Sequence, residues 1–173
     1  AGDTYRLYEI NPAVVSLAQT EFSFIADSPA HVELVIGDAR LSLEAEPPQA
    51  FDVLAVDAFS GDSIPVHLVT AQAMTVYLRH LKPAGIVAFH VTNRFLNLAP
   101  VIATIAANQN LHVALIHDDA ELPTLRTTDW VLVSRSAATL EQAAIRDRTT
   151  AITPIPGLPL WTDDFNNLFE VLK

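Results

Sequence analysis

The sequence lacks cysteine, has only five glycines among 173 residues and contains no long hydrophobic run. The absence of cysteine excludes disulfides, thiolate metal sites and a cysteine nucleophile. No apolar run approaches the ~20 residues that span a bilayer, and the first residues do not resemble a signal peptide, so we expect a cytoplasmic protein. The formal charge of −10 at pH 7 argues against nucleic-acid binding through a basic face.

Half of the residues are hydrophobic and 17% are charged, a composition that is typical of folded rather than disordered chains. The length suits one domain with a real hydrophobic core. We therefore expect residues 1–173 to form a single domain.

Strand-like apolar runs alternate with segments of helical periodicity along most of the chain. The predicted strands are 5–10, 32–36, 53–56, 86–91, 111–116 and 130–133. The predicted helices are 12–22, 39–45, 66–81, 98–108, 137–146 and 161–172. This alternation with short links predicts an α/β fold, a doubly wound and mostly parallel sheet with helices on both faces.

Carboxylates lie at the ends of three of the predicted strands. Glu9 is near the end of the first, Asp38 and Asp57 follow the second and third, and Asp62 lies in the loop after the third. Parallel strands bring their carboxyl ends to one edge, where open α/β folds bind ligands. A carboxylate such as Glu9 can accept both hydroxyls of a ribose, and Asp38 can accept from the exocyclic amine of adenine. Asp57 and Asp62 would then act at the reacting end of the substrates. Each of these acids could instead cap a helix or stabilise a turn. For Asp38, capping of the next helix explains the residue almost as well as contact with a ligand does.

A glycine-rich turn is absent after the first predicted strand. Nucleotide-binding folds of this type usually carry G-x-G-x-x-G there, and the five glycines of this chain are not spaced that way. We expect the true first strand and its glycine loop to lie upstream of Ala1.

Five segments together resemble the spermidine/spermine synthase family, the polyamine aminopropyltransferases. They are Y-E-I-N-P at 8–12, G-D-A-R at 37–40, D-V-L-A-V-D-A-F-S-G-D-S-I-P at 52–65, L-K-P-A-G-I-V-A-F-H-V at 81–91 and W-T-D-D-F-N-N-L at 161–168. The order and spacing of these segments carry the resemblance, which covers nearly all of the chain. It is closest to bacterial spermidine-synthase-like proteins, some of which are fused to membrane transporter segments.

The resemblance implies a Rossmann-like class I methyltransferase fold that binds decarboxylated S-adenosylmethionine and no metal. Glu9 would hold the ribose, and Asp38, with Ala39 beside it, would hold the adenine. Asp57 matches the first acid of the family's D-x-x-D loop, which deprotonates or orients the attacking amine of a polyamine. Asp62 is a looser match, because it lies five residues after Asp57 rather than three. The family also implies a homodimer as a possible assembly.

Two other functions stay open from the sequence. A methyltransferase would keep the nucleoside site and use S-adenosylmethionine. A non-catalytic domain or fragment would bind a nucleoside or polyamine without transfer, since the glycine loop and the amino-terminal hairpin of the family are absent here. A metal site is disfavoured because none of the six histidines forms an H-x-H or H-x-x-x-H pair. His90 is interpreted as a packed core residue near the sheet edge.

Overall fold

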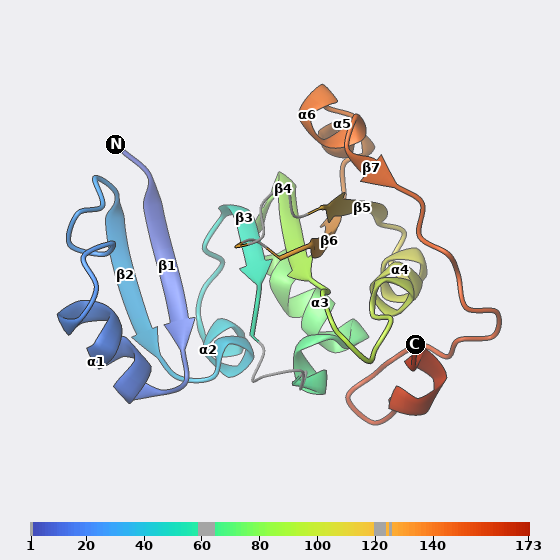
Figure 1. The fold of residues 1–173 in the computed structure, drawn as a ribbon, viewed down its shortest axis with the longest axis horizontal. Coiled ribbons are helices and arrows are strands. Elements are labelled where there is room, and N and C mark those ends of the chain that lie inside the picture. The colour runs from blue at the N-terminus through green and yellow to red at the C-terminus, as the bar shows by residue number, and fades with distance from the viewer. Residues whose placement is uncertain (1, 59–64, 120–123, 125) are drawn as a thin grey trace. The chain divides into compact units, whose positions relative to one another are not determined.

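The computed structural model describes residues 2–58, 65–119, 124 and 126–173 (Figure 1). The chain divides into two compact units, Ala1–Pro47 and Pro48–Lys173. The first unit contains a two-stranded sheet and the second a five-stranded sheet. No helix within these described ranges is both long enough and apolar enough to cross a membrane.

The first unit consists of two strand–helix pairs. They are β1 (Thr4–Glu9), α1 (Pro12–Thr20), β2 (His31–Ile36) and α2 (Ala39–Ala45). β1 and β2 pair in parallel from Thr4↔His31 to Glu9↔Ile36. The start of α1 is as predicted, because the Asn11 side chain accepts a hydrogen bond from Ala13 N and Pro12 occupies the first turn.

Four polar side chains tie β1, β2 and the end of α2 together within the first unit. The Arg6 guanidinium donates to Glu46 at 2.8 Å, to Glu33 and, through Nε, to the Tyr8 hydroxyl at 3.0 Å. The Tyr8 hydroxyl in turn donates to Glu46 at 2.8 Å. Burial and the bond to Glu46 raise the pKa of Tyr8 to about 12, and Glu46 also raises the pKa of Arg6. The network holds the neutral phenol and the charged guanidinium in place.

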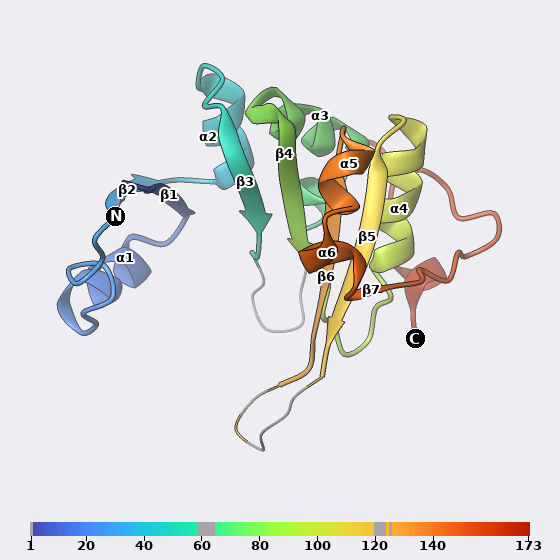
Figure 2. The same ribbon diagram turned by 90° about the horizontal axis from the view of Figure 1, so that it is seen from above.

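The second unit is a mixed sheet with helices packed against it. Its elements are β3 (Phe51–Val56), the 3-10 helix η1 (Val66–Leu68), α3 (Ala71–Arg79), β4 (Leu81–His90), α4 (Ala99–Asn108), β5 (His112–Asp118), β6 (Thr128–Ser134), α5 (Ala137–Leu140), α6 (Ala143–Arg146), β7 (Thr149–Thr150) and η2 (Leu168–Val171). The strand order is β3-β4-β6-β5-β7. β3 and β4 are parallel, and the other neighbours are antiparallel. β3, β4 and β5 therefore share one direction, and Figure 2 shows β5 and β6 running side by side. The predicted α/β fold is confirmed.

The predicted helix 66–81 and strand 86–91 have different bounds in the structure. The helix divides into η1 and α3, because Thr70 is extended and its hydroxyl accepts from Ala73 N to begin a new helix. β4 starts at Leu81, and its pairing with β3 jumps from Phe51↔Leu81 to Val53↔Ile86. The residues before Ile86, Gly85 among them, thus form an irregularity inside a strand.

The prediction of a closing helix over 161–172 is wrong. Only Leu168–Val171 forms a turn of 3-10 helix. Trp161 is fully buried as a packing residue, its carbonyl accepts from Ala71 N at 2.9 Å, and Thr70 donates to Asp163 at 2.7 Å. The segment is held by tertiary contacts with the start of α3, which replace the local hydrogen bonds that a helix would make.

The Tyr8 hydroxyl is expected to ionise at a higher pH than an ordinary tyrosine, because its pKa is raised. Its raised pKa favours the neutral phenol in the folded state, so its contribution to stability is full below pH ~10 and is lost as pH rises through about 12. Tyr8→Phe should remove a step near pH 12 from an alkaline titration of tyrosinate absorbance and lower the free energy of unfolding by about 1 kcal/mol. Tyr5→Phe, an exposed tyrosine on the same strand, should keep that step. Retention of the step in Tyr8→Phe would contradict the assignment.

Candidate functional site

Asp57 lies directly beyond the carboxyl end of β3, next to His90 of β4. The last paired residues of the two strands include Val56↔Phe89, so the next positions, Asp57 and His90, are lateral neighbours. His90 Nδ1 lies 2.7 Å from Asp57 Oδ1. The Asp57 side chain is 54% exposed and that of His90 is 21% exposed. The pair therefore places a solvent-accessible carboxylate against a largely covered imidazole.

The His90 ring is held from its other side by β6. His90 pairs with Trp130 across β4 and β6, and the two rings stack at 4.8 Å with planes 24° apart. Backbone bonds extend this attachment, because Val91 N donates to Asp129 O at 2.8 Å and Asp129 N donates to Thr92 Oγ1 at 2.7 Å. The end of β4 is thus fixed laterally by both neighbouring strands.

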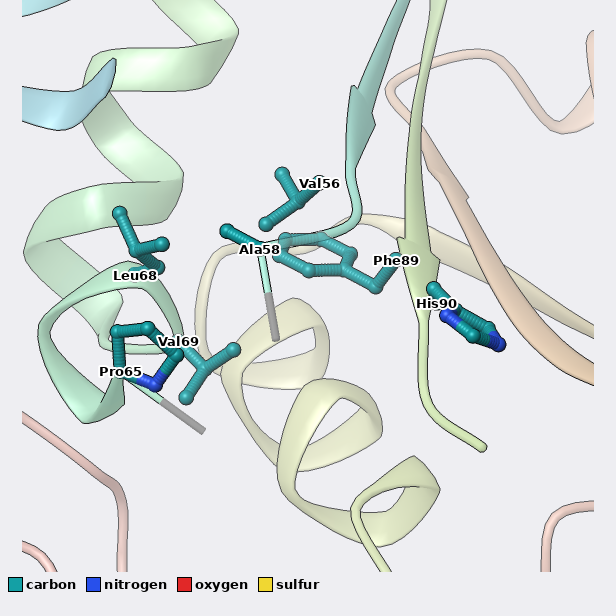
Figure 3. Close-up of a pocket in the computed structure, with 7 residues that line it drawn as sticks. All are labelled: Val56, Ala58, Pro65, Leu68, Val69, Phe89 and His90. Atoms are coloured by element: carbon teal, nitrogen blue, oxygen red, sulfur yellow. The ribbon is translucent and has the colours of Figure 1, made fainter. Parts of the chain in front are cut away.

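A small cavity lies beside this strand end (Figure 3). It is lined by Val56, Ala58, Pro65, Leu68, Val69, Phe89 and His90, and its volume is about 10 Å³. Figure 3 shows the Phe89 and His90 side chains leaving β4 on opposite sides, as the alternation of a strand requires. That volume corresponds to about one water molecule. The cavity itself therefore does not accommodate a nucleoside.

Glu9 ends β1, as the sequence predicted, and it has a local structural role. Its Oε1 accepts from the backbone N of Asn11 at 2.8 Å. This bond shapes the turn that leads into α1. The predicted contact of Glu9 with a ribose stays a prediction.

Asp38 is the N-cap of α2, and Ala39 is the first residue of that helix. Asp38 Oδ1 accepts from Leu41 N at 2.9 Å, so the capping interpretation is confirmed. Gly37 before it has φ +150°, where a side chain is strained. The adenine contact predicted for Asp38 and Ala39 stays a prediction.

The remaining part of the predicted site is not tested by the geometry. Glu9 and Asp38 belong to the first unit and Asp57 to the second, so a common edge for the three acids stays a prediction. Asp62 lies outside the described residues. Asn93, which follows the end of β4, is buried, and its Oδ1 accepts from Phe95 N and Leu96 N. It therefore shapes the loop after β4.

Two histidine–aspartate pairs were missed by sequence reasoning. The partner of Asp57 is His90, and an available signal was that both residues end neighbouring strands of similar pattern. The second pair is His117 with Asp129, whose register position across β5 and β6 places Nδ1 and Oδ1 2.6 Å apart. Asp119 lies 3.1 Å from His117 Nε2. No sequence motif predicts this pair, because the two residues become neighbours only when β5 pairs with β6.

His117 is expected to titrate above its usual pKa of 6.5, because Asp129 first and Asp119 second stabilise the imidazolium. Since the folded pKa is raised, the stabilising contribution is full below pH 6.5 and is lost as pH rises through the folded value. Asp129→Asn should lower the midpoint of His117 in an NMR titration of the ring protons. Asp118→Asn, which leaves both bonds in place, serves as the matched control. An unchanged midpoint in Asp129→Asn would contradict the pairing.

Comparison with known proteins gives similarity in sequence over half of the chain and in fold over most of it. No family model matches. A polyamine aminopropyltransferase from Vibrio vulnificus (strain CMCP6) is 33% identical over 92 residues, which are 51% of this chain and 29% of that protein. A spermidine synthase from Thermotoga maritima matches with a TM-score of 0.54 at 16% identity, covering 88% of this chain and 53% of that chain. A probable spermidine synthase from Corynebacterium glutamicum matches with a TM-score of 0.57 at 18% identity, covering 90% and 65% respectively.

These likenesses confirm the resemblance that the motifs indicated and the predicted methyltransferase-like fold. The structural matches have low sequence identity and show the fold alone. The chain spans 29% of the length of the curated relative and between about half and two thirds of the solved chains.

Proposed function

We propose, from a chain that is spermidine-synthase-like in sequence and fold, that it belongs to an enzyme that transfers an aminopropyl group from decarboxylated S-adenosylmethionine to a polyamine amine. The observation that carries the proposal is the half-exposed carboxylate of Asp57 at the carboxyl end of β3. Open α/β folds bind their ligands at this edge. A carboxylate there is suited to a cationic amine.

Asp57 would act on the amine that attacks. An ammonium group is not nucleophilic, so it must first lose a proton, and Asp57 accepts it as general base. The free amine attacks the methylene next to the sulfonium; the C–N bond forms, the C–S bond breaks and its electron pair stays on sulfur. The products are a longer polyamine and neutral methylthioadenosine. Holding the two reactants in line supplies much of the acceleration.

Glu9 and Asp38 would bind the nucleoside, and Asp62 would be a second acid for the polyamine. The local bonds of Glu9 to Asn11 N and of Asp38 to Leu41 N do not conflict with this role. A carboxylate offers about four acceptor sites, so one backbone donor leaves capacity for a ligand hydroxyl or amine. The local bonds would also keep each carboxylate in a fixed orientation.

The proposed catalytic role is tested by Asp57→Asn in the intact protein. Turnover of decarboxylated S-adenosylmethionine with a polyamine should fall by about 10²–10⁴-fold, because the amide cannot accept the proton. The dissociation constant for methylthioadenosine should stay within about twofold, since Asp57 is assigned to the amine.

Asp52→Asn is the matched control for this test. Asp52 lies on the same strand, is 80% exposed and pairs with Lys82 at 2.7 Å. Its loss should leave turnover unchanged. Equal effects of the two variants, or undiminished turnover in Asp57→Asn, would reject Asp57 as the general base.

The nucleoside site is tested by calorimetric titration with methylthioadenosine. Glu9→Gln keeps an acceptor for Asn11 N but removes the second acceptor oxygen, and Asp38→Ser keeps a helix cap but is too short for adenine. Each change should weaken binding by about tenfold or more, the loss of one or two hydrogen bonds to a charged acceptor. Asp27→Asn, an exposed acid of the same unit, should not change the affinity. Unaltered affinity in both site variants would remove them from the site.

The turnover assay, with its products identified, separates the alternative functions. Release of methylthioadenosine indicates aminopropyl transfer, and release of S-adenosylhomocysteine from S-adenosylmethionine indicates methyl transfer. Nucleoside binding without either product would favour a non-catalytic binding domain.

A further inference from the structure

We propose that His90 positions the carboxylate of Asp57 for proton transfer, an inference that rests on the proposed function. The two side chains meet because β3 and β4 are parallel and in register up to Val56↔Phe89. Their closest atoms, His90 Nδ1 and Asp57 Oδ1, are 2.7 Å apart. This is the distance of a strong hydrogen bond to a charged acceptor.

The direction of this hydrogen bond follows from the chemistry of the two groups. An ionised carboxylate only accepts, so the proton of the bond belongs to His90 Nδ1. The bond therefore selects the tautomer of the imidazole and fixes one oxygen of Asp57. The other oxygen of the carboxylate is then held in a defined orientation to accept the proton of the substrate amine.

The exposures of the two side chains assign the separate roles. Asp57 is 54% exposed, and its carboxylate is within reach of a ligand from solvent. His90 is 21% exposed, and its Nε2 atom is buried. A buried nitrogen cannot take a proton from a bound polyamine, because a general base must come within hydrogen-bond distance of that proton. His90 is thus a positioning residue, and Asp57 is the group that touches substrate.

Trp130 and the end of β6 make the imidazole a fixed support. The indole stacks on the His90 ring at 4.8 Å. The strand that carries Trp130 is attached just past His90 by the bonds Val91 N to Asp129 O and Asp129 N to Thr92 Oγ1. Asp57, His90 and Trp130 consequently form one row across three strands, with the reactive end at Asp57. A carboxylate supported in this way loses little freedom when the amine binds.

The proton balance of the step is simple. One proton passes from the substrate ammonium to Asp57 and then to solvent, while the C–N bond forms and the C–S bond breaks. His90 keeps its Nδ1 proton throughout and is neither oxidised nor consumed. Its removal should therefore impair the rate of the step and leave substrate binding in place.

Two substitutions of His90 in the intact protein separate the hydrogen bond from the packing. His90→Phe keeps a flat ring against Trp130 and loses the donor. His90→Asn places its Nδ2 donor about where Nδ1 lies. We expect His90→Phe to lower kcat by about 10–100-fold with KM for the polyamine and the methylthioadenosine Kd unchanged, as for a misplaced catalytic group. His90→Asn should recover most of the lost kcat.

A double variant and a matched control complete the test. In an Asp57→Asn background, His90→Phe should cause no further loss, because a positioning residue acts only through its partner. His112→Phe, an exposed histidine at the start of β5, should leave kcat unchanged. If thermal unfolding shows that His90→Phe does not fold, Trp130→Leu takes its place and should lower kcat with the same unchanged KM.

The possible failures are distinguishable. A wild-type protein without aminopropyl transfer overturns the proposed function and this inference with it. Wild-type transfer that persists undiminished in His90→Phe overturns the inference alone. Equal losses in the Phe and Asn variants, or a loss confined to KM, also overturn it, because each would indicate a packing or binding role.

Discussion

The parallel pairing of β3 with β4 is the constraint on which the candidate active edge depends. Two steps along β3, from Phe51 to Val53, are matched by five along β4, from Leu81 to Ile86. Gly85 permits this irregularity, because a Cβ at its position would lie 3.0 Å from the Phe51 carbonyl oxygen. Beyond that point the register is regular. A shift by one residue would turn His90 to the opposite face of the sheet.

The acids at the strand ends form two different kinds of hydrogen bond. Glu9 closes the turn before α1, and Asp38 caps α2, each through a backbone N–H. Asp57 is instead paired with a side chain from the neighbouring strand. A backbone donor fixes a carboxylate within its own loop, whereas a side-chain donor makes its orientation depend on the pairing of two strands. The proposed binding and catalytic acids therefore rely on different levels of structure.

In the second unit, the end of β4 is supported by an antiparallel neighbour, β6. β6 enters the sheet between β4 and β5 and is antiparallel to both. It brings Trp130 against His90 and Asp129 against His117 on successive residues. Because successive side chains of a strand point to opposite faces, one strand supports a stacked ring on one face and an ion pair on the other.

The sequence by itself determined the α/β class, the start of α1 at Asn11 and Pro12, and the placement of Glu9, Asp38 and Asp57 at or just past strand ends. These features depend on periodicity and on caps that act within a few residues. Only the tertiary structure decided the strand order and the neighbour of Asp57, because strand pairing joins residues far apart in the chain. The same reason explains why the helix predicted near Trp161 does not form. Burial of that indole, and the hydrogen bond that the Trp161 carbonyl accepts from Ala71 N at the start of α3, replaced the local hydrogen bonds that the pattern had indicated.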